Sequence, residues 1–156
     1  AVELQGLDGR WESANPVAEA EEAARRATAA EHARVVTELE LVDVQIQGAL
    51  DRYNKIWDGR DTAPYVEIQP VFAGEILPAV DAAIAHLDAI VTGDVPSQQA
   101  IAAQKSCALG LRAAYDRNSY FGPNLSKEDN DAQQAAAWSA TKAACDEAAN
   151  KRLPIS

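Results

Sequence analysis

NPVAEAEEAARRATAAEHARVVTELELVDVQIQGALDRYNKIWDG, residues 15–59, is the stretch that decides the fold. Apolar side chains recur along its second half at alternating steps of four and three, which is the spacing of a helix packed on other helices. Asn15 is a good N-cap and Pro16 suits the first helical position. We therefore predict one helix over 15–58, roughly 60 Å long. Its inward seam is Val35, Leu39, Val42, Ile46, Ala49, Tyr53 and Ile56.

Residues 38–47 permit a second interpretation, because their apolar and polar side chains alternate as in a half-buried strand. The helical spacing continues on both sides of this run without turn residues, so we favour helix. Gly48 is expected to mark a kink or a close approach by another helix.

The two halves of this helix differ. Before Val35 the seam loses its large side chains, and alanine takes the apolar positions. Glu21–Arg25 and Glu22–Arg26 have the spacing of favourable ion pairs on a solvated helix face. We predict that residues 16–34 meet a partner protein or a second copy rather than the core.

The rest of the chain follows a helical pattern in one domain, 1–156. We expect an all-α bundle of four or five helices, with the long helix as its spine. Gly and Pro residues mark a connection, Asp94 is a predicted N-cap, and Ser126–Asp129 resembles a capping box. The expected elements are a lead-in at 1–14, a connection at 59–70, and helices at 71–93, 95–118 and 127–152. A kink or a new helix start is expected near Pro78.

Composition excludes several functions. A net charge of −10 argues against sequence-independent binding of nucleic acid and against binding to anionic lipid. No run approaches the ~20 consecutive apolar residues of a membrane span. No phosphate-binding glycine loop and no nucleophile motif is present. Neither His32 nor His86 has closely spaced partner ligands, so no metal site and no cofactor is predicted.

Cys107 and Cys145 are the only cysteines. We favour a disulfide between them, which predicts an extracytoplasmic protein, secreted, periplasmic or in the cell envelope. The alternative is a pair of buried thiols in a cytosolic protein. The chain lacks an initiator Met, which is compatible with a mature form or a trimmed chain whose export signal has been removed.

Two further functions stay open. Aromatic side chains that share helix faces are candidates to line a slot for a small hydrophobic ligand such as a lipid or a haem-like molecule, or to fill the core. They are Tyr53, Trp57, Tyr115 and Trp138. The chain's size, its disulfide and the segment Asn15–Ala18 also resemble the secreted chorismate mutases, which implies an all-helical enzyme that binds a dianion through Arg and Lys from several helices. The inward seam here is apolar, so we rank a non-enzymatic interaction or accessory protein first.

Overall fold

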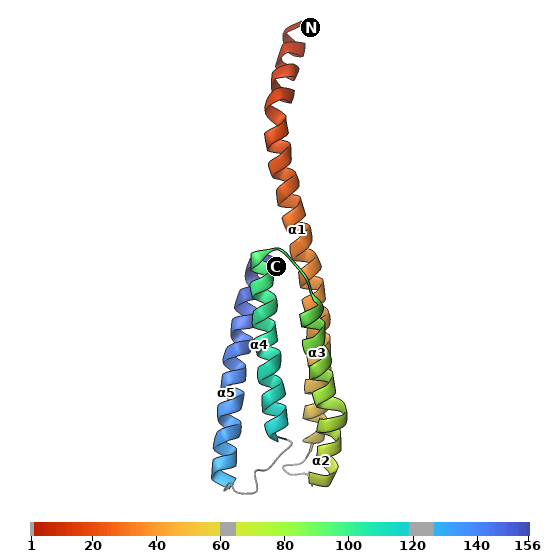
Figure 1. Cartoon of the computed structure of the whole chain (residues 1–156), viewed down its shortest axis with the longest axis vertical. Coiled ribbons are helices and arrows are strands. Elements are labelled where there is room, and N and C mark those ends of the chain that lie inside the picture. The colour runs from red at the N-terminus through yellow and green to blue at the C-terminus, as the bar shows by residue number, and fades with distance from the viewer. Residues whose placement is uncertain (1, 60–64, 119–126) are drawn as a thin grey trace.

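The computed structural model describes residues 2–59, 65–118 and 127–156, and their side chains from residue 15 onward with a few exceptions at segment ends. These residues form helices and no strand, so the all-α prediction is confirmed. The order is α1 (Val2–Ile56), α2 (Tyr65–Val71), the π-helix η1 (Phe72–Ile76), α3 (Leu77–Ala89), α4 (Val95–Asn118), α5 (Lys127–Arg152) and the 3₁₀-helix η2 (Leu153–Ile155). In Figure 1 the lower part of α1 forms a bundle with α3, α4 and α5, and the rest of α1 extends beyond it.

Helix α1 is longer than predicted. It begins at Val2, so the lead-in at 1–14 and the N-cap at Asn15 are wrong. Pro16 lies inside the helix, and the Asn15 side chain donates to Glu19 at 3.2 Å. A proline removes one backbone hydrogen bond. At 55 residues, α1 spans roughly 80 Å.

The strand-like run at 38–47 is helical, as favoured. Leu39 and Val42 are fully buried in the bundle, whereas Leu41 and Val44 point outward with 51% and 70% of their surface exposed. The alternation thus arises from a helix that is apolar on two faces. Gly48 lies in the uninterrupted helix, and no atom lies within 4 Å of the Cβ it lacks, so the expected close approach is wrong.

The predicted connection at 59–70 is shorter than expected, because helix α2 already begins at Tyr65. Residues 60–64 lie outside the described part. The predicted helix 71–93 divides into η1 and α3 and ends at Ala89, before Gly93. Pro78 lies in the first turn of α3, which confirms a new helix start near Pro78, one of the two alternatives. Because Pro78 has no N–H to offer the preceding turn, the wider π-helical turns of η1 come directly before it.

Helices α4 and α5 match the predicted ranges 95–118 and 127–152. Asp94 caps α4: the backbone N–H of Ser97 donates to Asp94 Oδ2 at 3.0 Å, and the Ser97 hydroxyl donates to the same atom at 2.6 Å. The predicted capping box begins at Ser126, outside the described residues.

The bundle has two apolar clusters, one above the other. The upper cluster joins Val35, Leu39 and Val42 of α1 to Ala83, Leu87, Ala100, Ala108 and Ile155. The lower cluster consists of Ala49, Ile56, Ile68, Phe72, Ile76, Val80 and Tyr115. The inward seam predicted for α1 therefore forms one wall of both clusters.

Helices α4 and α5 approach each other closely. Cys107 and Cys145 form the predicted disulfide, with their Cα atoms 4.5 Å apart. One turn further along, a Cβ added at Gly110 would lie 3.1 Å from Thr141 Oγ1 and 3.3 Å from its Cα. Only glycine leaves room for α5 at this point, so the close packing is built in beside the covalent link.

Candidate interaction surfaces

The projecting part of α1 has no cover from the rest of the described chain. Every residue from 16 to 30 is exposed, including Val17 at 67%. Arg25 forms an ion pair with Glu22 at 2.8 Å within the helix, and Arg26 lies 3.6 Å from the same carboxylate. Of the two predicted i,i+4 pairs, Glu22–Arg26 is present as the longer contact, whereas Glu21–Arg25 is wrong because Arg25 pairs with Glu22 instead. In Figure 1 this part of the helix extends well past the end of the bundle.

A polar clamp fixes the point where the projecting part leaves the bundle. Arg34 donates to the backbone oxygen of Val91 at 2.7 Å and to Glu31 at 2.5 Å. This guanidinium and a hydrogen bond from Thr92 lower the pKa of Glu31 to about 2, so its carboxylate stays ionised. Glu31 and His32 are half-buried at the clamp, whereas Ala33 and Arg34 are exposed, and contact of residues 16–34 with a partner stays a prediction.

His32 completes the clamp on another side of the helix. Its Nε2 lies 2.8 Å from Asp94 Oδ2, and both side chains are only 19% exposed. Hydrogen bonds from the hydroxyl and the backbone N–H of Ser97 lower the pKa of Asp94, the N-cap of α4, and His32 beside it contributes less. The direction in which α1 leaves the bundle is therefore tied both to the α3–α4 connection and to the first turn of α4.

His86 serves the same function one turn deeper in the bundle. Its Nε2 lies 2.5 Å from Glu38, and its Nδ1 lies 3.3 Å from the side-chain oxygen of Gln45. Both histidines thus join α1 to the elements that follow it. Among the described residues, no three His, Cys, Asp or Glu side chains are grouped so that they could hold a metal ion.

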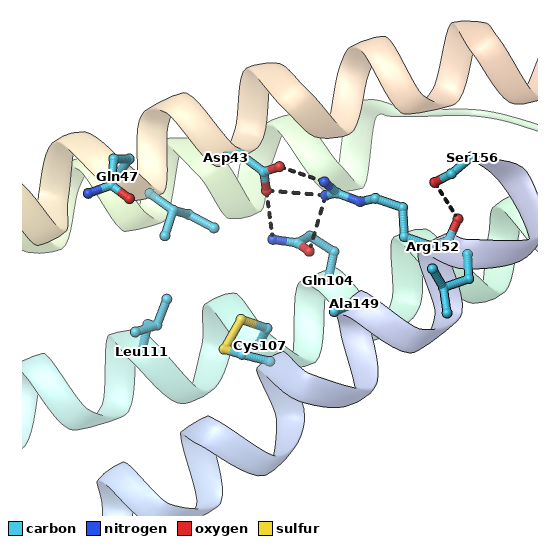
Figure 2. A pocket seen from close by; sticks show the side chains of 11 residues that line it. Asp43, Gln47, Gln104, Cys107, Leu111, Ala149, Arg152 and Ser156 are labelled. Atoms are coloured by element: carbon cyan, nitrogen blue, oxygen red, sulfur yellow. Dashed lines mark hydrogen bonds and ion pairs between the residues drawn. A yellow bond between two sulfur atoms is a disulfide. The ribbon is translucent and has the colours of Figure 1, made fainter.

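A groove separates α1 from α5, and it encloses about 460 Å³ (Figure 2). Arg152 of α5 crosses it to Asp43 of α1 through two contacts of 2.5 and 3.1 Å. Gln104 of α4 contacts both partners at 3.4 Å. Beside the polar residues Gln47 and Ser156, the rest of the lining is apolar or belongs to the disulfide: Ile46, Leu111, Cys107, Cys145, Ala149 and Leu153.

The charge of Arg152 is already matched by Asp43, so it is not available to an anionic ligand. Arg152 is also the only Arg or Lys among the described residues that line this groove. The enzyme alternative requires cations from several helices around a dianion, and this groove supplies no such set. The ion pair between Asp43 and Arg152 was not predicted, because the two residues lie 109 positions apart and no local sequence pattern joins them.

The four aromatic residues predicted to line a ligand slot come together at the lower end of the bundle. Tyr53 is the centre, with its ring centroid 5.1 Å from Tyr115, 5.8 Å from Trp138 and 6.4 Å from Trp57. Phe72, which was not among the four predicted residues, joins them with its ring centroid 5.9 Å from that of Tyr53. The rings pack against one another, which is the core-filling alternative; ligand binding by them stays a prediction.

Tyr115 is fully buried in this cluster, and its hydroxyl has no hydrogen-bond partner within the described part of the chain. Burial raises the pKa of Tyr115 to about 12, with a further contribution from Tyr53. Burial also raises the pKa of Tyr53. Both phenols therefore remain neutral at any physiological pH.

One stretch, Val66–Ala89, is long and apolar enough to cross a membrane by length and composition alone. The same test is passed by core helices of soluble proteins. Here the apolar side of the stretch supplies Ile68, Phe72, Ile76, Val80, Ala83 and Leu87 to the two clusters. Only 28% of the most apolar window is buried, so the two clusters cover one side of this stretch and leave its other side exposed.

No protein-family model matches the chain, and neither the curated proteins nor the solved structures include a significant match.

Proposed function

We propose that this chain is a non-enzymatic helical-bundle interaction protein that binds a protein partner through the projecting part of α1. The observation that carries the proposal is the contrast within one helix. Residues 35–56 supply the wall of both core clusters, whereas residues 16–30 are exposed on every side.

Physical chemistry supports a covered state for this part of α1. A helix of this length is only marginally stable in water on its own, since most helical stability in proteins comes from packing an apolar face. Alanine keeps its intrinsic propensity high, and its small side chains let a second helix approach closely. The clamp through Arg34 and His32 holds the exposed stretch in a fixed direction, which lowers the entropy lost on docking.

We further propose that the protein works outside the cytoplasm. The disulfide Cys107–Cys145 supports this, because such bonds persist in oxidising compartments and are rare in reducing ones. The bundle would present the same surface whether the protein is secreted, periplasmic or part of the cell envelope.

The test uses the whole chain as bait in an extract of its own host. Ala27→Glu places a charge in the middle of the exposed alanine face, and Ala143→Glu makes the same change at an exposed position of α5. We expect wild type and Ala143→Glu to retain a protein, either another copy or a different chain, that Ala27→Glu loses. All three baits should unfold cooperatively on heating, which shows that each keeps the folded bundle. Retention of the same proteins by Ala27→Glu, or of none by wild type, would overturn the proposal.

A further inference from the structure

The outward face of α1 carries a second seam, which we call the outer seam. Its positions advance in alternating steps of three and four, and all of them are exposed. They are Ala20, Ala23, Ala27, Ala30, Arg34, Thr37, Leu41, Val44 and Gly48. A spacing that averages 3.5 residues is the repeat of a left-handed coiled coil. Unlike the inward seam, this one runs without a break from the projecting part of α1 into the packed part.

The two ends of the outer seam differ in size. Large apolar side chains stand at the bundle end, where Leu41 and Val44 are 51% and 70% exposed. Only alanines stand at the projecting end, from Ala20 to Ala30. A face with large residues at one end and small residues at the other complements itself when a second copy runs in the opposite direction.

We propose that the occupant of the outer seam is a second copy of this chain, paired antiparallel along α1. This inference rests on the proposed function and names its partner. A two-fold axis near His32 sets Ala20 of one copy against Val44 of the other, and Ala23 against Leu41. Ala27 then faces Thr37, and Ala30 faces the aliphatic stem of Arg34. Each projecting end covers the exposed leucine and valine of the other copy.

Charge complementarity favours this direction. In the same register, Arg26 beside the seam lies next to Glu40 of the other copy, and the symmetry makes this pair twice. Arg26 has only the 3.6 Å contact with Glu22, and Glu40 makes no ion pair or hydrogen bond with another residue in the described segments. In a parallel, in-register pair, by contrast, Arg34 would face Arg34 inside the seam.

The pairing also brings two like charges close together, because the two copies of Glu31 lie next to each other at the two-fold axis. Each of these carboxylates already carries the guanidinium of its own Arg34 at 2.5 Å, which offsets the repulsion. At the far end Gly48 faces Pro16. No atom lies within 4 Å of a Cβ position at Gly48, so the ring of Pro16 has room there.

The overall shape permits the pairing. The overlap from residue 16 to residue 48 is roughly 50 Å long. Since the copies run in opposite directions, each bundle lies beside the projecting helix of the other copy, and the two bundles are at opposite ends. The projecting part of α1 in Figure 1 leaves space for this. The inward seam of each α1 stays in its own bundle.

Sedimentation equilibrium of the full chain tests the association. We expect wild type to be a dimer and Leu41→Glu to be a monomer, since the substitution buries two charges against Ala23. Leu109→Glu, which makes the same change at a leucine of α4 that is 47% exposed, should remain a dimer. A wild-type monomer at all concentrations, or a Leu41→Glu dimer, would overturn the inference.

A charge exchange tests the register. Arg26→Glu and Glu40→Arg should each weaken the dimer, because each sets two like-charged pairs in place of two opposite ones. The double variant Arg26→Glu with Glu40→Arg should recover most of the wild-type affinity. Recovery is the expected result, and additive weakening in the double variant would contradict the antiparallel register.

Cysteine cross-linking tests the direction. In the antiparallel pair the two copies of residue 23 lie roughly 27 Å apart, too far for a disulfide. Ala23→Cys and Leu41→Cys should therefore cross-link only when the two variants are mixed. Cross-linking of either variant with itself would overturn the antiparallel direction. If wild type proves monomeric while Ala27→Glu still loses a different protein, the self-pairing fails and the proposed function stands.

Discussion

Arg152, in the last turn of α5, reaches across the groove to Asp43 of α1, with its Nη1 atom 2.5 Å from Oδ2. Helix α5 packs mainly on α4, so this pair is its principal polar tie to α1. On α1 the pair lies inside the bundle, a little more than two helical turns after the clamp at Arg34. The pair therefore helps to hold α1 as part of the bundle while the rest of the helix stays exposed.

Arg152→Ala should lower the free energy of unfolding by about 1 kcal/mol, because the pair is partly shielded from water and charge-assisted. Urea unfolding followed by circular dichroism measures this. Lys142→Ala is the matched control, because it removes the exposed pair Lys142–Asp146 within α5. The control should leave stability nearly unchanged, and an equal loss in both variants would show that the bridge has no special weight.

Replacing both Cys107 and Cys145 by alanine should destabilise the fold by roughly 4 kcal/mol in the chain-entropy model. The reason is that the bond closes a loop between residues 38 positions apart and so restricts the unfolded chain. Thermal melting of wild type with and without a reductant should show the same loss as the double variant. A melting temperature that neither treatment changes would contradict the prediction.

Tyr115→Phe should leave stability at neutral pH unchanged or slightly higher, because it removes a buried hydroxyl without a partner in the described part of the chain. The pKa of Tyr115 is about 12 in the folded state, above the ordinary value of 10.0. The unfolded chain then loses its proton first, and wild type is destabilised as the pH rises from 10 toward 12. Tyr115→Phe should lose less stability over this range. Parallel pH profiles of the two proteins, from urea unfolding, would be the contrary result.

The sequence was sufficient for the features that depend on local pattern. The inward seam from Val35 to Ile56, the cap at Asp94 and the ranges of α4 and α5 were all found from spacing and capping residues. The disulfide was also favoured, because the antiparallel order of two helices brings its cysteines to similar heights.

Other features depend on contacts that no local pattern records. The start of α1 was predicted at Asn15 because an Asn followed by a Pro is typical of a helix start. In the structure the same two residues lie inside the helix, and the sequence alone does not separate these two cases. The bridge from Asp43 to Arg152 joins residues far apart in sequence, and only the folded bundle brings them together. The strand-like alternation at 38–47 had a physical cause that the sequence alone did not reveal: a helix with apolar residues on both its inward and its outward face.

Hydrogen–deuterium exchange of the backbone amides in α1 tests the central claim most directly, namely that residues 16–30 are a docking surface that the chain itself does not cover. In dilute solution we predict fast exchange over 16–30 and slow exchange over 35–56. At a concentration where the chain associates, or with a bound protein partner, exchange over 16–30 should slow markedly, whereas exchange over 35–56 is already slow in the monomer and should change much less. Slow exchange over 16–30 in dilute monomer, or fast exchange there at every concentration and with every retained partner, would contradict the account.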